Sequence, residues 1–259
     1  SGCIIQCIAR NPLADTGLIG INAGAGLMVV LYIIFFGATT INSIFTIPIF
    51  GILGGILTAL IVILLAYKEG EGITSIALVL TGVALQAGIS AFTIITVIRL
   101  DDTQYKFVAS WLAGQFLGSS WKFTIVLSIW VMALLPFAYY KTKVLDILNF
   151  GDDTALGLGV DVQKQRLLLL LLSVSLAAAC VSIGGNIVFV GLIAPHLGRH
   201  IIGPKHQYLL PTCATVGATL VLLADTLGRI VIEPSSIPTG IMTAIIGAPY
   251  FIYLLVKLK

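Results

Sequence analysis

The chain has 259 residues, of which 58% are hydrophobic and only 10% are charged, and its mean hydropathy is +1.09. A soluble globular domain is about 45–50% apolar and about 25% charged, so this composition excludes a soluble domain, a disordered chain and a disulfide scaffold. The net charge of +3 comes without a dense basic cluster and gives no reason to expect a nucleic-acid partner. The composition predicts an all-α, polytopic membrane protein.

The first nine residues, SGCIIQCIA, form an apolar run before Arg10. This run has no basic n-region and no small-residue cleavage site, so it is not a signal peptide. It is also too short to cross a bilayer, which takes about 20 helical residues. We interpret it as the tail of a helix whose beginning is missing, so that the chain is N-terminally truncated.

Long uncharged runs then follow one another along the chain. Such runs favour helices over the strands of a membrane barrel, which alternate apolar and polar residues. Residues 107–121 are apolar but short, and they predict an interfacial or re-entrant helix. We expect one transmembrane domain over residues 1–259, with eight complete spans at about 18–37, 48–67, 72–98, 123–140, 167–183, 187–202, 208–229 and 239–256.

Residues 141–166 form the longest polar excursion and hold eight charges. Asp152 and Asp153 suit the first turn of a short helix, because carboxylates stabilise helix N-termini. Ala155, Leu156 and Leu158 give this helix an apolar side, and Gly159 can end it. A short amphipathic helix in a loop suits docking into the groove of a partner, the alternative being a merely solvated loop.

The basic residues predict which loops face the cytoplasm. Alternate loops and ends, including the 141–166 excursion and the C-terminus, carry ten Lys and Arg residues, and the other set carries four: Arg99, Lys106, Lys122 and Arg229. Cytoplasmic loops carry the excess of Lys and Arg. We therefore expect 141–166 inside the cell, and the loops at 99–121 and 230–238 outside.

Catalytic chemistry finds little support. The chain lacks GxxxxGK[ST], HExxH and GxSxG, so no phosphate-binding loop, zinc-protease motif or hydrolase elbow is present in the sequence. His196 and His200 have the i, i+4 spacing of a metal pair, but cationic residues at a cytoplasmic helix end are the simpler interpretation. We predict no enzyme, no cofactor and no metal site.

Asp225 is the acidic residue placed inside a predicted span, and Arg229 follows it by one helical turn. A local ion pair is the favoured interpretation of this spacing. A proton relay in an ion-coupled secondary transporter is the alternative, since carriers of that class mark their paths with buried charges.

Several long blocks in order closely resemble the FecCD-type permeases, the membrane subunits of ABC importers for iron–siderophore complexes, haem and cobalamin. The blocks are NPLADTGLIGINAGAG (11–26), TGVALQAGISAF (81–92), SWLAGQFLGSSW (110–121), GDDTALGLGVDVQKQRL (151–167), FVGLIAPHLGRHIIGPKHQYLLP (189–211), LLADTLGR (222–229) and IPTGIMTAIIGAPYF (237–251). The sequence departs from the family in GGNIVF, where Asn186 replaces a usual Pro or Thr and Val188 replaces a usual Gly or Ala.

The resemblance implies roles for particular residues. The loop that seats in the ATPase falls on Gly151, Asp152, Ala155, Leu158, Gly159 and Val160. Arg229 matches an arginine that pairs with an acidic residue of the binding protein. Thr74 and Ser75 lie near the cytoplasmic gate.

The resemblance also implies the assembly. It predicts a ten-span permease that pairs with a second permease, identical or paralogous, in a bacterial cell (inner) membrane. Separate ATP-binding cassette subunits would supply energy, and an extracytoplasmic substrate-binding protein would deliver an iron–siderophore complex. Cobalamin or haem import is the alternative within the family.

Overall fold

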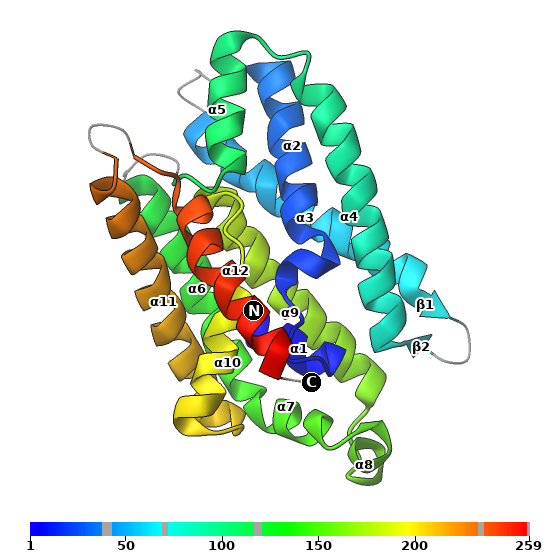
Figure 1. Ribbon diagram of the computed structural model, residues 1–259. Coiled ribbons are helices and arrows are strands. Elements are labelled where there is room, and N and C mark those ends of the chain that lie inside the picture. The colour runs from blue at the N-terminus through cyan, green and yellow to red at the C-terminus, as the bar shows by residue number, and fades with distance from the viewer. Residues whose placement is uncertain (38–42, 69–71, 117–120, 233–235, 258–259) are drawn as a thin grey trace.

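The computed structural model describes residues 1–37, 43–68, 72–116, 121–232 and 236–257, and helices dominate them (Figure 1). The predicted all-α class is therefore confirmed. Two short strands, β1 (Tyr67–Lys68) and β2 (Gly72–Ile73), pair antiparallel, and a 3-10 turn, η1 (Thr16–Ile19), precedes α2. The helices are α1 (Gly2–Ala9), α2 (Ile21–Phe36), α3 (Ser43–Ala66), α4 (Ser75–Val97), α5 (Asp102–Leu112), α6 (Trp121–Tyr140), α7 (Thr142–Asn149), α8 (Asp152–Gly157), α9 (Val162–Gly184), α10 (Val190–Ile202), α11 (His206–Ile230) and α12 (Thr239–Lys257).

Helix length and composition identify the membrane-crossing segments. Within the described residues, four helices are long and apolar enough to cross a bilayer: Thr46–Ala66, Ile76–Val97, Val162–Gly184 and His206–Ile230. Three shorter apolar helices cover Ile21–Phe36, Leu127–Tyr140 and Thr239–Leu254. These segments follow the predicted spans closely, because uninterrupted apolar runs leave the helix as the conformation that satisfies the backbone in lipid.

The span expected at 187–202 is shorter in the structure. Its helix, α10, has 13 residues and begins at Val190, which gives a length of only about 20 Å. The residues between Gly185 and Phe189 are irregular, and Phe189 has a positive φ of 67°. The break expected at Gly184–Gly185–Asn186 is thus confirmed, and Asn22 Nδ2 of α2 donates a hydrogen bond to Asn186 Oδ1 at 2.9 Å across it.

Two other boundaries differ from the sequence-based expectation. The short helix expected at 107–121 is α5, which begins at Asp102 because Asp101 accepts a hydrogen bond from Gln104 N at 2.8 Å and caps it. The polar excursion contains an additional helix, α7, which buries Thr142, Leu145 and Leu148 on one face. The excursion is therefore a folded platform of two helices rather than a single helix in a loop.

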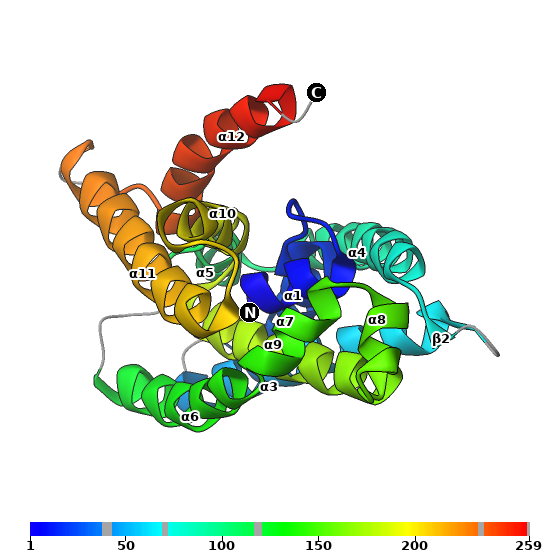
Figure 2. The same cartoon turned by 90° about the horizontal axis from the view of Figure 1, so that it is seen from below.

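Helix α9 lies at the centre of the bundle, against α1, α2, α3 and α6 (Figure 2). Of the apolar membrane-spanning stretch of α9, 72% is buried inside the molecule, whereas 17% is buried for the corresponding stretches of α4 and α11. The apolar outer faces of α4 and α11 therefore have the composition of surfaces that contact lipid or another membrane subunit.

Small residues bring α2 and α3 into close contact. Gly54 of α3 is so near α2 that a Cβ atom on it would lie 2.3 Å from the Gly24 carbonyl oxygen. Without a hydrophobic driving force between helices in lipid, such close backbone approach supplies the packing that holds a membrane bundle together.

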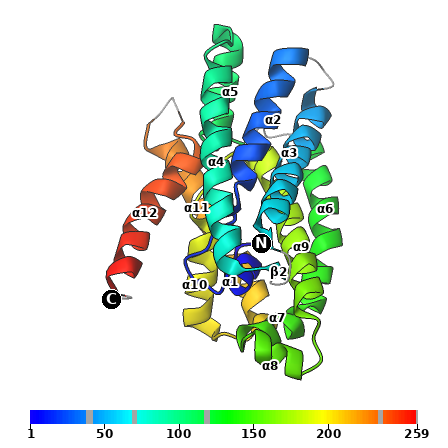
Figure 3. The ribbon, with the colours of Figure 1, turned by 90° about the vertical axis from the view of Figure 1, so that its right-hand side faces the viewer.

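The two predicted loop sets lie at opposite ends of the molecule (Figures 1 and 3). Helices α7 and α8 and the paired strands β1 and β2 gather at one end, whereas α5, the end of α11 and the start of α12 lie at the other. This arrangement agrees with the sidedness inferred from the basic residues, with the α7–α8 end in the cytoplasm.

Candidate functional site

The short helix α8 projects from the α7–α8 end of the bundle between two glycines with positive φ. Gly151, before it, has φ 110°, and Gly159, after it, has φ 79°. Gly159 N donates to the Leu156 carbonyl at 2.9 Å, and Val160 N donates to the Ala155 carbonyl at 3.0 Å, which closes the helix end. The predicted start at Asp152 is confirmed, and the chain turns away from the helix at Gly159.

The apolar residues of α8 do not share one side. Ala155 is 0% exposed and seats the helix on the bundle, whereas Leu156 and Leu158 are 59% and 63% exposed. Grouping all three as one apolar side was wrong, because Ala155 faces the bundle, whereas Leu156 next to it on the helix and Leu158 at the helix C-cap are exposed. Phe150, which precedes α8 and which the sequence reading missed, is also exposed (74%). We call these three exposed apolar residues in and next to α8 (Phe150, Leu156 and Leu158) the α8 edge.

Asp152, the first residue of α8, lies in an ion-pair network. Its carboxylate accepts hydrogen bonds from Arg10 Nη2 at 2.5 Å and from Arg166 Nη2 at 2.9 Å. Arg10 ends α1 and Arg166 lies in the second turn of α9. The network ties α8 to two helices that are distant in sequence.

The predicted gate residues lie at the start of α4. Thr74 is the N-cap of this helix, and its side chain accepts a hydrogen bond from Ala77 N at 3.3 Å. Ser75 is the first residue of the helix, and its side chain lies outside the described part of the structure. Ile73, directly before them, is buried and in contact with α9 through Arg166 and Gln163.

Carboxylates fix the starts of α9 and α11. Asp161 caps α9, and the hydrogen bond that it accepts from the Lys164 backbone N–H holds the pKa of its carboxyl below the usual range. Asp146 of α7 accepts hydrogen bonds from the backbone N and from Nδ1 of His206, the first residue of α11, at 2.9 and 2.7 Å. This second contact joins α7 to the start of α11.

Arg229 lies at the opposite end of α11. Its Nε donates to Asp225 Oδ2 at 2.8 Å, so the local ion pair expected from the spacing is present. Asp225 also accepts a hydrogen bond from Thr239 Oγ1 at 2.8 Å, which links α11 to the start of α12. The Arg229 side chain remains 62% exposed and is therefore available to a partner on this face.

The histidine pair has a structural partner. His196 Nδ1 lies 2.6 Å from the hydroxyl of Tyr250 on α12, and the His196 and His200 rings are 4.7 Å apart. Among the described residues there is no group of three or more His, Cys, Asp or Glu side chains arranged to hold a metal ion. The pair therefore contributes to the contact between α10 and α12.

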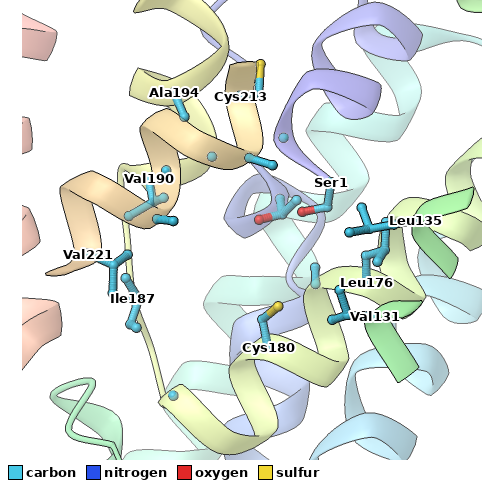
Figure 4. Close-up of a pocket in the computed structure, with 18 of the residues that line it drawn as sticks. Ser1, Val131, Leu135, Leu176, Cys180, Ile187, Val190, Ala194, Cys213 and Val221 are labelled. Atoms are coloured by element: carbon cyan, nitrogen blue, oxygen red, sulfur yellow. The ribbon is translucent and has the colours of Figure 1, made fainter. Parts of the chain in front are cut away.

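A cavity of about 1250 Å³ lies between α6, α9, α10 and α11 (Figure 4). Leu135, Leu176, Val190 and Val221 face it, one from each helix, and Ser1 lies at its edge. No described side chain in its wall is charged. The wall suits apolar contents and offers no charge that could hold an ionic ligand.

Comparison with known proteins identifies the family. Residues 1–257 match the FecCD transport family. The chain is 43% identical to the iron(3+)-hydroxamate import system permease protein FhuG of Bacillus subtilis, over 99% of this chain and 77% of that protein. It is 36% identical to the hemin transport system permease protein HmuU of Yersinia pestis, over 99% of this chain and 77% of that protein.

The fold agrees with this relationship. A solved structure of a metal-chelate type ABC transporter in an inward-facing conformation superposes with a TM-score of 0.88 at 33% identity. The match covers 99% of this chain and 80% of that one. These findings favour an ABC permease over an ion-coupled secondary transporter. The chain belongs to the FecCD transport family and is a membrane-embedded permease of an ABC importer, a non-enzymatic subunit that works with ATPase subunits and a partner permease.

Proposed function

We propose that this chain forms the path for an iron–siderophore complex across a bacterial cell membrane. The observation that carries the choice of substrate is the 43% identity to a hydroxamate permease over nearly the whole chain. Haem is the second candidate, because a hemin permease is 36% identical over the same share of the chain.

The ATPase subunits dock on α8 in this proposal. Leu158 and the rest of the α8 edge supply the apolar contact, since exposed apolar patches on a polar face mark protein–protein contacts. Gly151 and Gly159 set the helix at its angle, Ala155 and Val160 anchor it to the bundle, and Asp152 fixes its first turn. ATP binding draws the α8 helices of the two permeases together, and this movement changes the opening of the gate at Thr74 and Ser75.

An uptake assay tests the proposed substrate. The full transporter, with its ATPase subunits and its extracytoplasmic binding protein, is reconstituted in liposomes with ATP at the cytoplasmic face. We expect accumulation of a radiolabelled ferric hydroxamate that depends on ATP and exceeds that of hemin and cobalamin. Uptake of hemin in preference to the hydroxamate would overturn the choice of substrate while leaving the permease assignment intact.

The binding protein docks on the outer face, with Arg229 as one contact. Arg229→Glu places a carboxylate beside Asp225 and in front of the acidic partner residue, so we expect binding-protein affinity to fall about tenfold or more. Arg99→Glu is the matched control, because Arg99 is also exposed on the outer face and its reversal changes the net charge equally. Surface plasmon resonance on the assembled transporter measures both. Equal affinities for the two variants would remove Arg229 from the interface.

A further inference from the structure

Arg166 is a buried cation at the cytoplasmic end of α9. Its residue is only 6% exposed, and a buried guanidinium requires hydrogen-bonding partners to offset its lost hydration. Nη2 donates to both carboxylate oxygens of Asp152, at 2.9 and 3.2 Å, and Nη1 donates to the backbone carbonyl of Ile73 at 2.8 Å. The Arg166 side chain therefore binds α8 through Nη2 and the segment before α4 through Nη1.

Ile73 is held by the first two turns of α9 through both of its backbone groups. Its carbonyl accepts from Arg166, and its N–H donates to Gln163 Oε1 at 3.4 Å. The Ile73 side chain is 5% exposed and packs in the main apolar core. The next residue, Thr74, caps α4, so the position of Ile73 sets where α4 begins.

Arg10 contacts the same carboxylate from another direction. Its Nη2 donates to Asp152 Oδ1, and the Arg10 and Asp152 side chains are each 40% exposed. Arg10 thus connects α8 to the end of α1, and Arg166 connects α8 to α4. The two arginines form a matched pair in which only Arg166 reaches the predicted gate.

We propose that Arg166 is a positioning residue that transmits displacement of α8 to the start of α4. This inference rests on the proposed roles of α8 in ATPase docking and of Thr74 in the gate. A guanidinium is planar and its nitrogens are fixed relative to one another, so a shift of Asp152 reorients the nitrogen that holds Ile73. Movement of α8 therefore either carries the 73–75 segment with it or breaks charge-assisted hydrogen bonds.

The experiment compares ATP hydrolysis with transport in the full reconstituted transporter. Arg166→Gln keeps a polar side chain but loses the positive charge and the planar guanidinium whose two nitrogens bind Asp152 and Ile73. We expect this variant to assemble with the ATPase and hydrolyse ATP, while the ferric hydroxamate transported per ATP falls about tenfold. Arg166→Lys keeps the charge and has donors for both partners, but these donors sit on one freely rotating nitrogen rather than in a fixed planar fork, so we expect about a threefold fall.

Arg10→Gln is the matched control. It removes the other arginine from Asp152 and leaves the contact with Ile73 in place, so we expect the transported amount per ATP to stay within about twofold of the wild type. The same ratio in all three variants as in the wild type would overturn the proposal. Failure of both Arg166 variants to assemble would also overturn it, because Arg166 would then serve folding alone.

A distance measurement provides a second, independent readout. Spin labels at Thr154 of α8 and Ile76 of α4, both exposed, report the separation of the two helices. In the wild type we expect one narrow distance distribution with and without ATP, and in Arg166→Gln a broader distribution when ATP is bound. A distribution unchanged by the substitution would contradict transmission through Arg166. If the proposed function fails instead, the wild-type transporter itself shows no ATP-driven uptake of the hydroxamate.

Discussion

Replacing Gly159 with proline is expected to reduce ATP-driven uptake about tenfold or more and to weaken ATPase association. Proline fixes φ near −65°, whereas Gly159 has φ 79°, so the turn after α8 cannot form. Proline also removes the N–H that donates to the Leu156 carbonyl. Because no atom lies within 4 Å of a Cβ built on Gly159, the effect comes from the backbone rather than from crowding.

Gly203→Pro is the matched control for this variant. Gly203 also has a positive φ, 88°, has open space around a built Cβ, and donates its N–H to the Arg199 carbonyl at 3.0 Å. It ends α10 and lies outside the α8 edge. Co-purification of the ATPase and an uptake assay measure both variants. Normal ATPase association in Gly159→Pro, or an equal loss in Gly203→Pro, would contradict docking through α8.

Gly54→Ala is expected to lower the thermal stability of the transporter. The new Cβ would lie 2.3 Å from the Gly24 carbonyl oxygen and 2.6 Å from Met28 Cγ, so α2 and α3 must separate. Overpacking of this kind costs about 1–3 kcal/mol. At about 2–4 °C per kcal/mol, the apparent Tm in detergent should fall by several degrees.

Gly88→Ala is the control for that substitution. Gly88 also lies within a membrane helix, α4, but no atom lies within 4 Å of a Cβ built on it. We expect its Tm to stay equal or to rise by up to about 2–4 °C, since only helix propensity changes and alanine is favoured over glycine by about 1 kcal/mol. A thiol-reactive dye assay on the free cysteines measures both transitions. Equal shifts would show that the α2–α3 contact does not limit stability.

The spans were predictable because a long apolar segment in lipid can satisfy its backbone hydrogen bonds only as a helix. The spans over α3, α4 and α9 follow from uncharged runs, and the span over α11 follows from an apolar run that holds only Asp225 and Arg229 near its end. Helix α7 was missed because its buried residues, Thr142, Leu145 and Leu148, are interleaved with lysines and Asp146, which made the segment resemble a solvated loop. Their three-residue spacing was the available sign of a half-buried helix.

The contacts of the site were harder to predict than its position. The position of α8 could be predicted because Asp152 and Gly159 bracket it in the sequence. The pairing of Arg10 with Asp152 joins residues 142 positions apart, and the bond from Arg166 to Ile73 spans 93 positions. No local pattern encodes such distances, because they depend on how α1, α4 and α9 pack together.

The bond between Asp146 and His206 has a mechanical consequence. Helix α11 begins at the cytoplasmic platform and continues as one helix of 25 residues to the face that carries Arg229, a length of about 37 Å. Pro211, in the second turn of α11, interrupts the hydrogen-bond ladder near this end, so an angular change imposed by α7 tilts mainly the long segment that follows Pro211. The contact with α7 at one end of the bundle and the exposed Arg229 at the other are thereby joined through a single helix.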